Sequence, residues 1–138
     1  MLYNQSQDLI NGNTISAQGA KYISYISDGI KEFKYLTNLD LNLHGKKISD
    51  KGAKYISDGI KELKNLTNLK LDLCGNTISA QGAKYISDGK KQLKYLTNLN
   101  LNLSFNDFSD QGVKYIIDGI KELFKRKQHF RLRRQVYQ

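Results

Sequence analysis

The sequence repeats itself with a period of 30 residues, and this repetition constrains the fold more than any other feature. The string LTNL begins at Leu36, Leu66 and Leu96, and after each copy leucine continues to alternate with a polar residue. The string SDG recurs with the same period. Four helix-like halves and three strand-like halves can be counted along the 138 residues, so we expect one array of similar units.

Each unit changes its hydrophobic period halfway, and this change locates two elements. Leucines alternate with polar residues over 69–73, which is typical of a strand with one buried face. Ala83, Ile86 and Leu93 then share one face of a helix. A serine suited to be the N-cap begins every helical half, at Ser16, Ser49, Ser79 and Ser109.

No single unit of this length can bury its own apolar face, so the units must stack. Parallel pairing of successive strands and side-by-side packing of successive helices give a two-layer solenoid. The sequence therefore predicts an α/β fold.

The segment from Leu96 to Asn106 has the form LxxLxLxLxxN, and it resembles a leucine-rich repeat of the ribonuclease-inhibitor-like type. The resemblance spans residues 9–124. It implies a leucine-rich-repeat solenoid of about four repeats of about 30 residues, with parallel strands on the concave face and helices on the convex face. It also implies that Asn13, Asn76 and Asn106 bond to backbone between turns, and that Lys46 interrupts this row.

The positive charge is concentrated at the C-terminal end. Residues 121–138 hold seven basic residues and one acid, within a formal net charge of +9 for the chain. We therefore divide the chain into a solenoid over 1–124 and a basic C-terminal extension over 125–138, an edge strand or a cap. Its charges would block unwanted strand pairing. The functional alternative is a polyanion contact through Lys125, Arg126, Lys127, Arg131, Arg133 and Arg134.

Two surfaces are candidates for contact with a protein partner. The strands should present a polar face that includes Asp40, Lys70, Asp72, Asn100 and Asn102. This face has no aromatic residue, although protein interfaces usually contain a few. The helices should present a row of tyrosines, Tyr25, Tyr55, Tyr85 and Tyr115, unless these rings fill the grooves between helices while Lys–Asp pairs cover the surface.

Lys90 departs from the repeat, because Ile30, Ile60 and Ile120 stand at the matching position. That position lies on the buried side of each predicted helix. We expect the Lys90 ammonium to reach outward along its aliphatic stem or to pair with an acid.

The sequence gives little support for catalysis, a cofactor or a metal. His44 and His129 belong to no metal-ligand spacing or nucleophile motif. Cys74 falls in a turn whose counterparts are His44 and Ser104, which indicates a permissive turn position rather than a nucleophile. We expect a protein that is not an enzyme and binds no cofactor.

The leading hypothesis is a non-enzymatic protein–protein interaction scaffold, a subunit or part of a larger cytoskeletal, ciliary or regulatory assembly. The alternative is a polyanion-binding module that acts through the basic extension. Nucleic acid is not expected, because a broad basic surface and stacking motifs are missing. With no secretory signal, no membrane-spanning run and one cysteine, we expect a cytoplasmic or cytoskeletal location. Another chain, or residues of a longer chain, should cover the N-terminal edge.

Overall fold

The computed structural model describes residues 28–29 and 32–136, and within them strands alternate with helices. Three strands form one parallel sheet in the order β1-β2-β3. A helix follows each strand. The elements are β1 (Asn38–Asn42), α3 (Asp50–Ile60), β2 (Asn68–Asp72), α4 (Ala80–Lys91), β3 (Asn98–Asn102) and α5 (Asp110–Val136).

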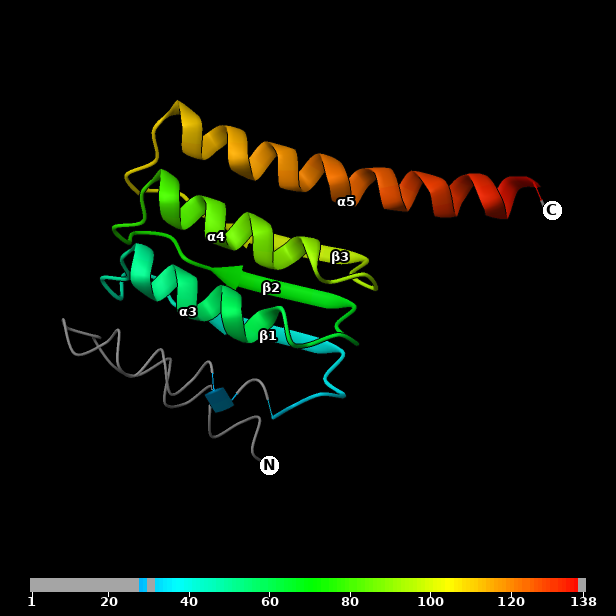
Figure 1. Cartoon of the computed structure of the whole chain (residues 1–138), viewed down its shortest axis with the longest axis horizontal. Coiled ribbons are helices and arrows are strands. Elements are labelled where there is room, and N and C mark those ends of the chain that lie inside the picture. The colour runs from blue at the N-terminus through cyan, green and yellow to red at the C-terminus, as the bar shows by residue number, and fades with distance from the viewer. Residues whose placement is uncertain (1–27, 30–31, 137–138) are drawn as a thin grey trace.

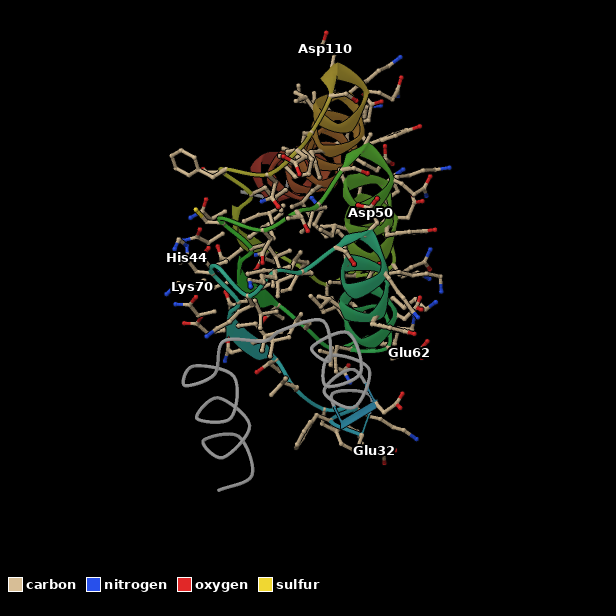
Figure 2. All side chains as sticks on the ribbon, turned by 90° about the vertical axis from the view of Figure 1, so that its left-hand side faces the viewer. Glu32, His44, Asp50, Glu62, Lys70 and Asp110 are labelled. Carbon is tan, nitrogen blue, oxygen red and sulfur yellow. The ribbon has the colours of Figure 1, made fainter. Side chains whose placement is uncertain are left out.

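The pairing register of the sheet equals the period of the sequence. Leu39 pairs with Leu69, which pairs with Leu99, each 30 residues further along the chain. The three helices lie side by side over one face of the sheet (Figure 1). Viewed from the end, strands and helices form two layers, with His44 and Lys70 on the sheet side and Glu62 on the helix side (Figure 2). The predicted α/β leucine-rich-repeat solenoid is confirmed.

The core lies between the two layers and agrees with the predicted change of period. Leu71 of β2 is 2% exposed and Leu93, after α4, is fully buried. From the helices, Ala53, Ile56 and Ile86 close the other side of the core. Burying a side chain of this size contributes about 1.5–3 kcal/mol, so the alternating leucines supply much of the stability of the stack.

A buried asparagine ties each turn to the turn before it. The Asn76 side chain is 5% exposed, accepts hydrogen bonds from the backbone N–H groups of Lys46 and Ile48, and donates to the carbonyls of Leu43 and Leu73. Asn106 repeats this arrangement one unit later, accepting from Ile78 N–H. The predicted role of these two asparagines is confirmed, whereas Asn13 lies outside the described residues.

Neighbouring helices approach closely through serine and glycine. The Ser57 hydroxyl donates to the carbonyl of Tyr85 at 2.6 Å, and Ser87 donates to Tyr115 in the same way at 2.8 Å. A Cβ at Gly89 or Gly119 would overlap the serine oxygen of the preceding helix. Glycine is therefore required at both positions by the approach of the helices.

Helices α3 and α4 begin after the predicted serines, but only one of the two serines makes a capping hydrogen bond with its side chain. Ser79 is the N-cap of α4 and accepts from the Gln81 N–H, whereas Ser49 is the N-cap of α3 with no side-chain cap bond. At α4 the carboxylate of Asp50, from the preceding helix, accepts from the N–H groups of Ser79 and Gly82 at 2.7 and 3.1 Å. Helix α4 is thus capped by its neighbour as well as by its own serine.

The interpretation of residues 130–136 as an edge strand is wrong, because α5 runs without a break from Asp110 to Val136. The segment 121–136 contains no glycine, proline, asparagine or aspartate that would end a helix, and it is rich in Lys, Arg, Gln and Leu. Helix α5 extends past the ends of α4 and β3 (Figure 1). The predicted boundary between residues 124 and 125 falls inside this helix, and the role of the extension as a cap stays a prediction.

Candidate functional site

The polar face of the sheet is largely bonded to itself. The side-chain amide of Asn68 donates to Asn38, and that of Asn98 donates to Asn68, which forms a ladder across the three strands. One step along the strands, Lys70 pairs with Asp40 at 3.2 Å. A shallow hollow of about 370 Å³ lies over these rows and extends to Asn100. The predicted strand-face residues are therefore neighbours, but Asp40 and Lys70 already pair with each other.

The last outward-facing side chain of each strand accepts a hydrogen bond from the backbone of the turn that follows. The Asp72 carboxylate accepts from the Cys74 N–H at 2.9 Å, and the Asn102 side chain accepts from the Ser104 N–H at 3.2 Å. Asn42 does the same for His44 at 3.1 Å. Asp72 and Asn102, both predicted to face a partner, thus have a local structural role.

The tyrosines of the described helices are half-buried rather than fully displayed. Tyr55, Tyr85 and Tyr115 each have intermediate exposure, and Tyr55 packs against the core. The Lys84 ammonium lies 5.9 Å from the centre of the Tyr115 ring, close enough for a cation–π contact. This arrangement favours packing in the grooves between helices over a tyrosine docking surface. Tyr25 lies outside the described residues.

Ion pairs cover the outside of the helices, as expected. Lys54 pairs with Asp58 at 3.0 Å, and the hydrogen bond from this pair raises the pKa of Lys54. Asp58 also pairs with Lys61 at 3.0 Å, and this second pair recurs in the next unit, where Asp88 pairs with Lys91 at 3.4 Å. Such exposed pairs contribute less than about 1 kcal/mol each.

The predicted polyanion contacts all fall on α5. Lys125 is exposed. For the other five contacts, only the helical backbone belongs to the described part of the chain: Arg126, Lys127, Arg131, Arg133 and Arg134.

Sequence reasoning missed the apolar edge of the last described unit. We define the open edge as five residues of the last described unit: Leu99 and Leu101 of β3, Leu103 just after it, and Val113 and Ile117 on α5. The three leucines are only partly buried, and Val113 and Ile117 are 47% and 45% exposed. Comparing the units column by column would have found it, because Ala83 and Ser87 stand at the positions of Val113 and Ile117.

Phe105 is a second feature that the sequence analysis did not identify. It is 86% exposed and has a φ of 54°, in a turn where the matching residues, Gly45 and Gly75, have φ values of 62° and 69°. A bulky residue rarely adopts this left-handed conformation, which costs about 1 kcal/mol or more. An exposed ring in a strained turn is the kind of side chain that protein interfaces use as an anchor.

Lys90 is buried, as predicted, but its ammonium neither reaches solvent nor pairs with an acid among the described residues. The residue is 6% exposed, and its Nζ has no hydrogen-bond partner among the described residues. Burial, aided by the charge of Lys91, lowers the pKa of Lys90 to about 8. Small cavities of about 10 Å³ adjoin its side chain, which leaves no room for a ligand.

At the ends of the first two strands, His44, Asp72 and Cys74 come together. One ligand atom from each, an imidazole nitrogen, a carboxylate oxygen and the sulfur, lie within 4.8 Å of one another. Among the described residues, no hydrogen bond joins the Asp72 carboxylate to the His44 ring, so the group lacks the orienting contact of a Cys–His–Asp nucleophile. His44 is exposed and Cys74 is buried.

None of the described helices is long and apolar enough to cross a membrane.

Comparison with known proteins agrees with the fold. Residues 65–87 and 95–116 match the family model described as Leucine Rich repeat. Among solved structures, the chain is similar to actin-binding site 2 of leiomodin-1, with a TM-score of 0.57 and 14% sequence identity over 99% of this chain and 92% of that one. No curated protein sequence matches the chain significantly. The chain thus carries leucine-rich repeats at two positions and folds as a leucine-rich-repeat solenoid.

Proposed function

We propose that this chain is a non-enzymatic scaffold that binds a protein partner through its open edge, as a subunit or part of a larger assembly. Leucine-rich repeats support an interaction role in general, but a fold does not specify a partner. The assignment to the ribonuclease-inhibitor-like type is part of this proposal.

The observation that carries the proposal is the difference in burial between equivalent residues. Leu69, Leu71 and Leu73 are at most 2% exposed, whereas the leucines of β3 are only partly buried and two aliphatic side chains of α5 are almost half exposed. Contiguous exposed apolar surface on a soluble domain marks a contact site. In the preceding unit, the same positions are covered by the next strand and helix.

The residues beside the open edge indicate the chemistry of the partner. Helix α5 carries the open edge in its first turns and then continues as the most basic segment of the chain, with seven basic residues and one acid over 121–138. The partner that fits is a protein surface with an apolar patch beside acidic residues. Electrostatic complementarity of this kind speeds association and selects among partners.

We propose that the partner assembly is cytoskeletal. The similar solved structure is named for an actin-binding site. At 14% identity this likeness concerns the fold, so actin is a partner to test here. The ciliary and regulatory assemblies remain alternatives within the same proposal.

Sedimentation with actin filaments tests the proposal. We expect the chain to pellet with filaments, and Ile117→Ser and Val113→Ala to weaken binding at least 5-fold, because these variants give α5 the residues of α4. Tyr95→Asn is a matched control, since Tyr95 is 64% exposed, is not one of the residues of the open edge, and has Asn65 as its counterpart. A chain that stays in the supernatant contradicts the actin assignment, and equal binding by all variants contradicts the role of the open edge.

The basic helix keeps polyanion binding as the alternative function. Binding driven by phosphate or sulfate groups weakens steeply with salt, whereas apolar docking does not. Titration with heparin at increasing salt separates the two functions. Strong, salt-sensitive binding that is unchanged by Ile117→Ser would favour the polyanion-binding module.

A further inference from the structure

We propose that His44, Asp72 and Cys74 form a binding site for a divalent transition metal ion, with zinc as the ion that suits them best. The site joins two neighbouring units, since His44 comes after β1 while Asp72 and Cys74 lie at and after the end of β2. It is separate from the open edge, and neither the resemblance nor the comparisons assign it. Its combination of side chains, position and hydrogen bonding carries the inference.

The three side chains offer the ligands that zinc prefers. Zinc binds imidazole nitrogen, carboxylate oxygen and thiolate sulfur at about 2.0–2.3 Å, usually with four ligands in a tetrahedron. In such a tetrahedron the ligand atoms lie about 3.3–3.8 Å apart. The three atoms are already within 4.8 Å of one another, so a small movement of the exposed His44 ring closes the site. A soft thiolate ligand disfavours calcium and magnesium, which prefer oxygen.

The backbone prepares the site before any ion binds. One Asp72 oxygen accepts the Cys74 N–H at 2.9 Å, which fixes the carboxylate beside the cysteine and leaves its other oxygen for a metal. The His44 N–H is held in the same way by Asn42, and the Gly45 N–H donates to the Cys74 carbonyl at 2.9 Å. These bonds hold the two turns together. The bond to the Asp72 carboxylate is made to a ligating group, and a hydrogen bond of this kind typically raises metal affinity.

The next unit provides an internal comparison. Asn102 and Ser104 stand where Asp72 and Cys74 stand, and the Asn102–Ser104 bond keeps the same turn geometry. An amide and a hydroxyl are poor zinc ligands. The turn therefore folds without metal ligands, and the ligand types at 44, 72 and 74 are not needed to form it.

With three protein ligands, the site leaves a fourth position for water or for a group from another molecule. Binding converts the Cys74 thiol to a thiolate, and its proton passes to solvent. The ion would link the turn of one unit to that of the next, so metal binding should stabilise the stack.

Titration of the full chain with cobalt chloride is the direct test, because Co²⁺ reports its ligands by absorption. We expect a thiolate-to-cobalt charge-transfer band, visible bands of tetrahedral intensity, and loss of both on adding zinc chloride. The chain has one cysteine, so any thiolate band comes from Cys74. Zinc chloride should also raise the melting temperature.

Three variants copy residues of the last described unit and so preserve the turn: Cys74→Ser, Asp72→Asn and His44→Ser. We expect Cys74→Ser to abolish the charge-transfer band and each of the others to weaken cobalt binding at least 10-fold. His129→Gln, outside the site, should bind like the unchanged chain, and circular dichroism checks the fold of each variant. Absence of the band, or equal affinity in His44→Ser and Asp72→Asn, would overturn the proposal.

Discussion

The middle unit and the last described unit have nearly the same sequence pattern but differ in burial. Leu71 is 2% exposed and Leu101, its partner in the sheet, is only partly buried. Asn76 is buried and Asn106 is partly exposed, although both make the same kind of backbone contacts. A residue in this array is therefore buried by the next unit as much as by its own, as expected for nearest-neighbour stacking.

The same substitution in the two units should give very different losses of stability. Leu71→Ala should lower the free energy of unfolding by about 3–5 kcal/mol, because it opens a cavity between covered layers. Leu101→Ala should cost about 1–2 kcal/mol, because its side chain is already partly in water. Urea denaturation of the full chain measures both values.

Equal losses in the two variants would contradict the contrast between the units. They would mean that the edge of β3 is covered in solution, for example by another copy of the chain. Light scattering across a range of concentrations would then detect the covering molecule.

Lys90→Ile places in α4 the isoleucine that α3 and α5 have at the matching position. It removes the buried charge that distinguishes α4 from the helices beside it. A lowering of the Lys90 pKa from 10.5 to about 8 corresponds to about 3 kcal/mol of destabilisation at neutral pH. We expect the variant to be more stable by about that amount at pH 7, measured by urea denaturation. Lys94→Ile changes an exposed lysine of the same unit and should have little effect.

The pH dependence of this gain tests its electrostatic cause. The folded protein holds Lys90 neutral more readily than the unfolded chain does, so the penalty is complete below pH 8 and disappears as the pH rises through 10.5. The advantage of Lys90→Ile should therefore shrink to about half by pH 9.5. A gain that is constant with pH would assign it to packing instead.

Much of the fold could be predicted from local chemistry. Alternating leucines, the serine N-caps and the asparagines at 76 and 106 are each recognisable within a single unit, and the 30-residue period became the pairing register of the sheet. The extension was misjudged because Phe130 to Arg133 alternate over only four residues. The lack of any helix-breaking residue beyond Gly119 was the stronger signal.

The site was harder to predict, because its residues meet across units. His44 and Cys74 are 30 residues apart and belong to no motif along the chain, yet the period places them side by side. Whether Ile117 is exposed depends on whether another element packs beside α5. The sequence of a single unit does not contain this information. Among the described residues the Lys90 ammonium has no hydrogen-bond partner, and mainly apolar residues of three elements line the small cavity beside its side chain, which a single unit likewise does not reveal.

The smallest change in stability that we predict concerns the helix starts, where the residue that could cap the next helix differs between the two interfaces. Asp50 caps α4 through the N–H groups of Ser79 and Gly82, whereas Ala80 stands at the matching position before α5. Asp50→Ala should lower the free energy of unfolding by about 1–2 kcal/mol, as is usual for a lost cap.

The reverse change, Ala80→Asp, should supply the missing cap to α5. A Cβ placed at Gly82 lies 3.2 Å from the Asp50 Cα, and one at Gly112 lies 3.1 Å from the Ala80 Cα, so the two interfaces have the same spacing. An aspartate at 80 can therefore reach the N–H groups of Ser109 and Gly112, and we expect a gain of about 0.5–1 kcal/mol in urea denaturation. Ala80→Asn separates the hydrogen bond from the charge, since it keeps the acceptor without the interaction with the helix dipole. A loss of stability in Ala80→Asp would show that α5 does not repeat the geometry of α4, and the comparison of the two units would then fail at the helices.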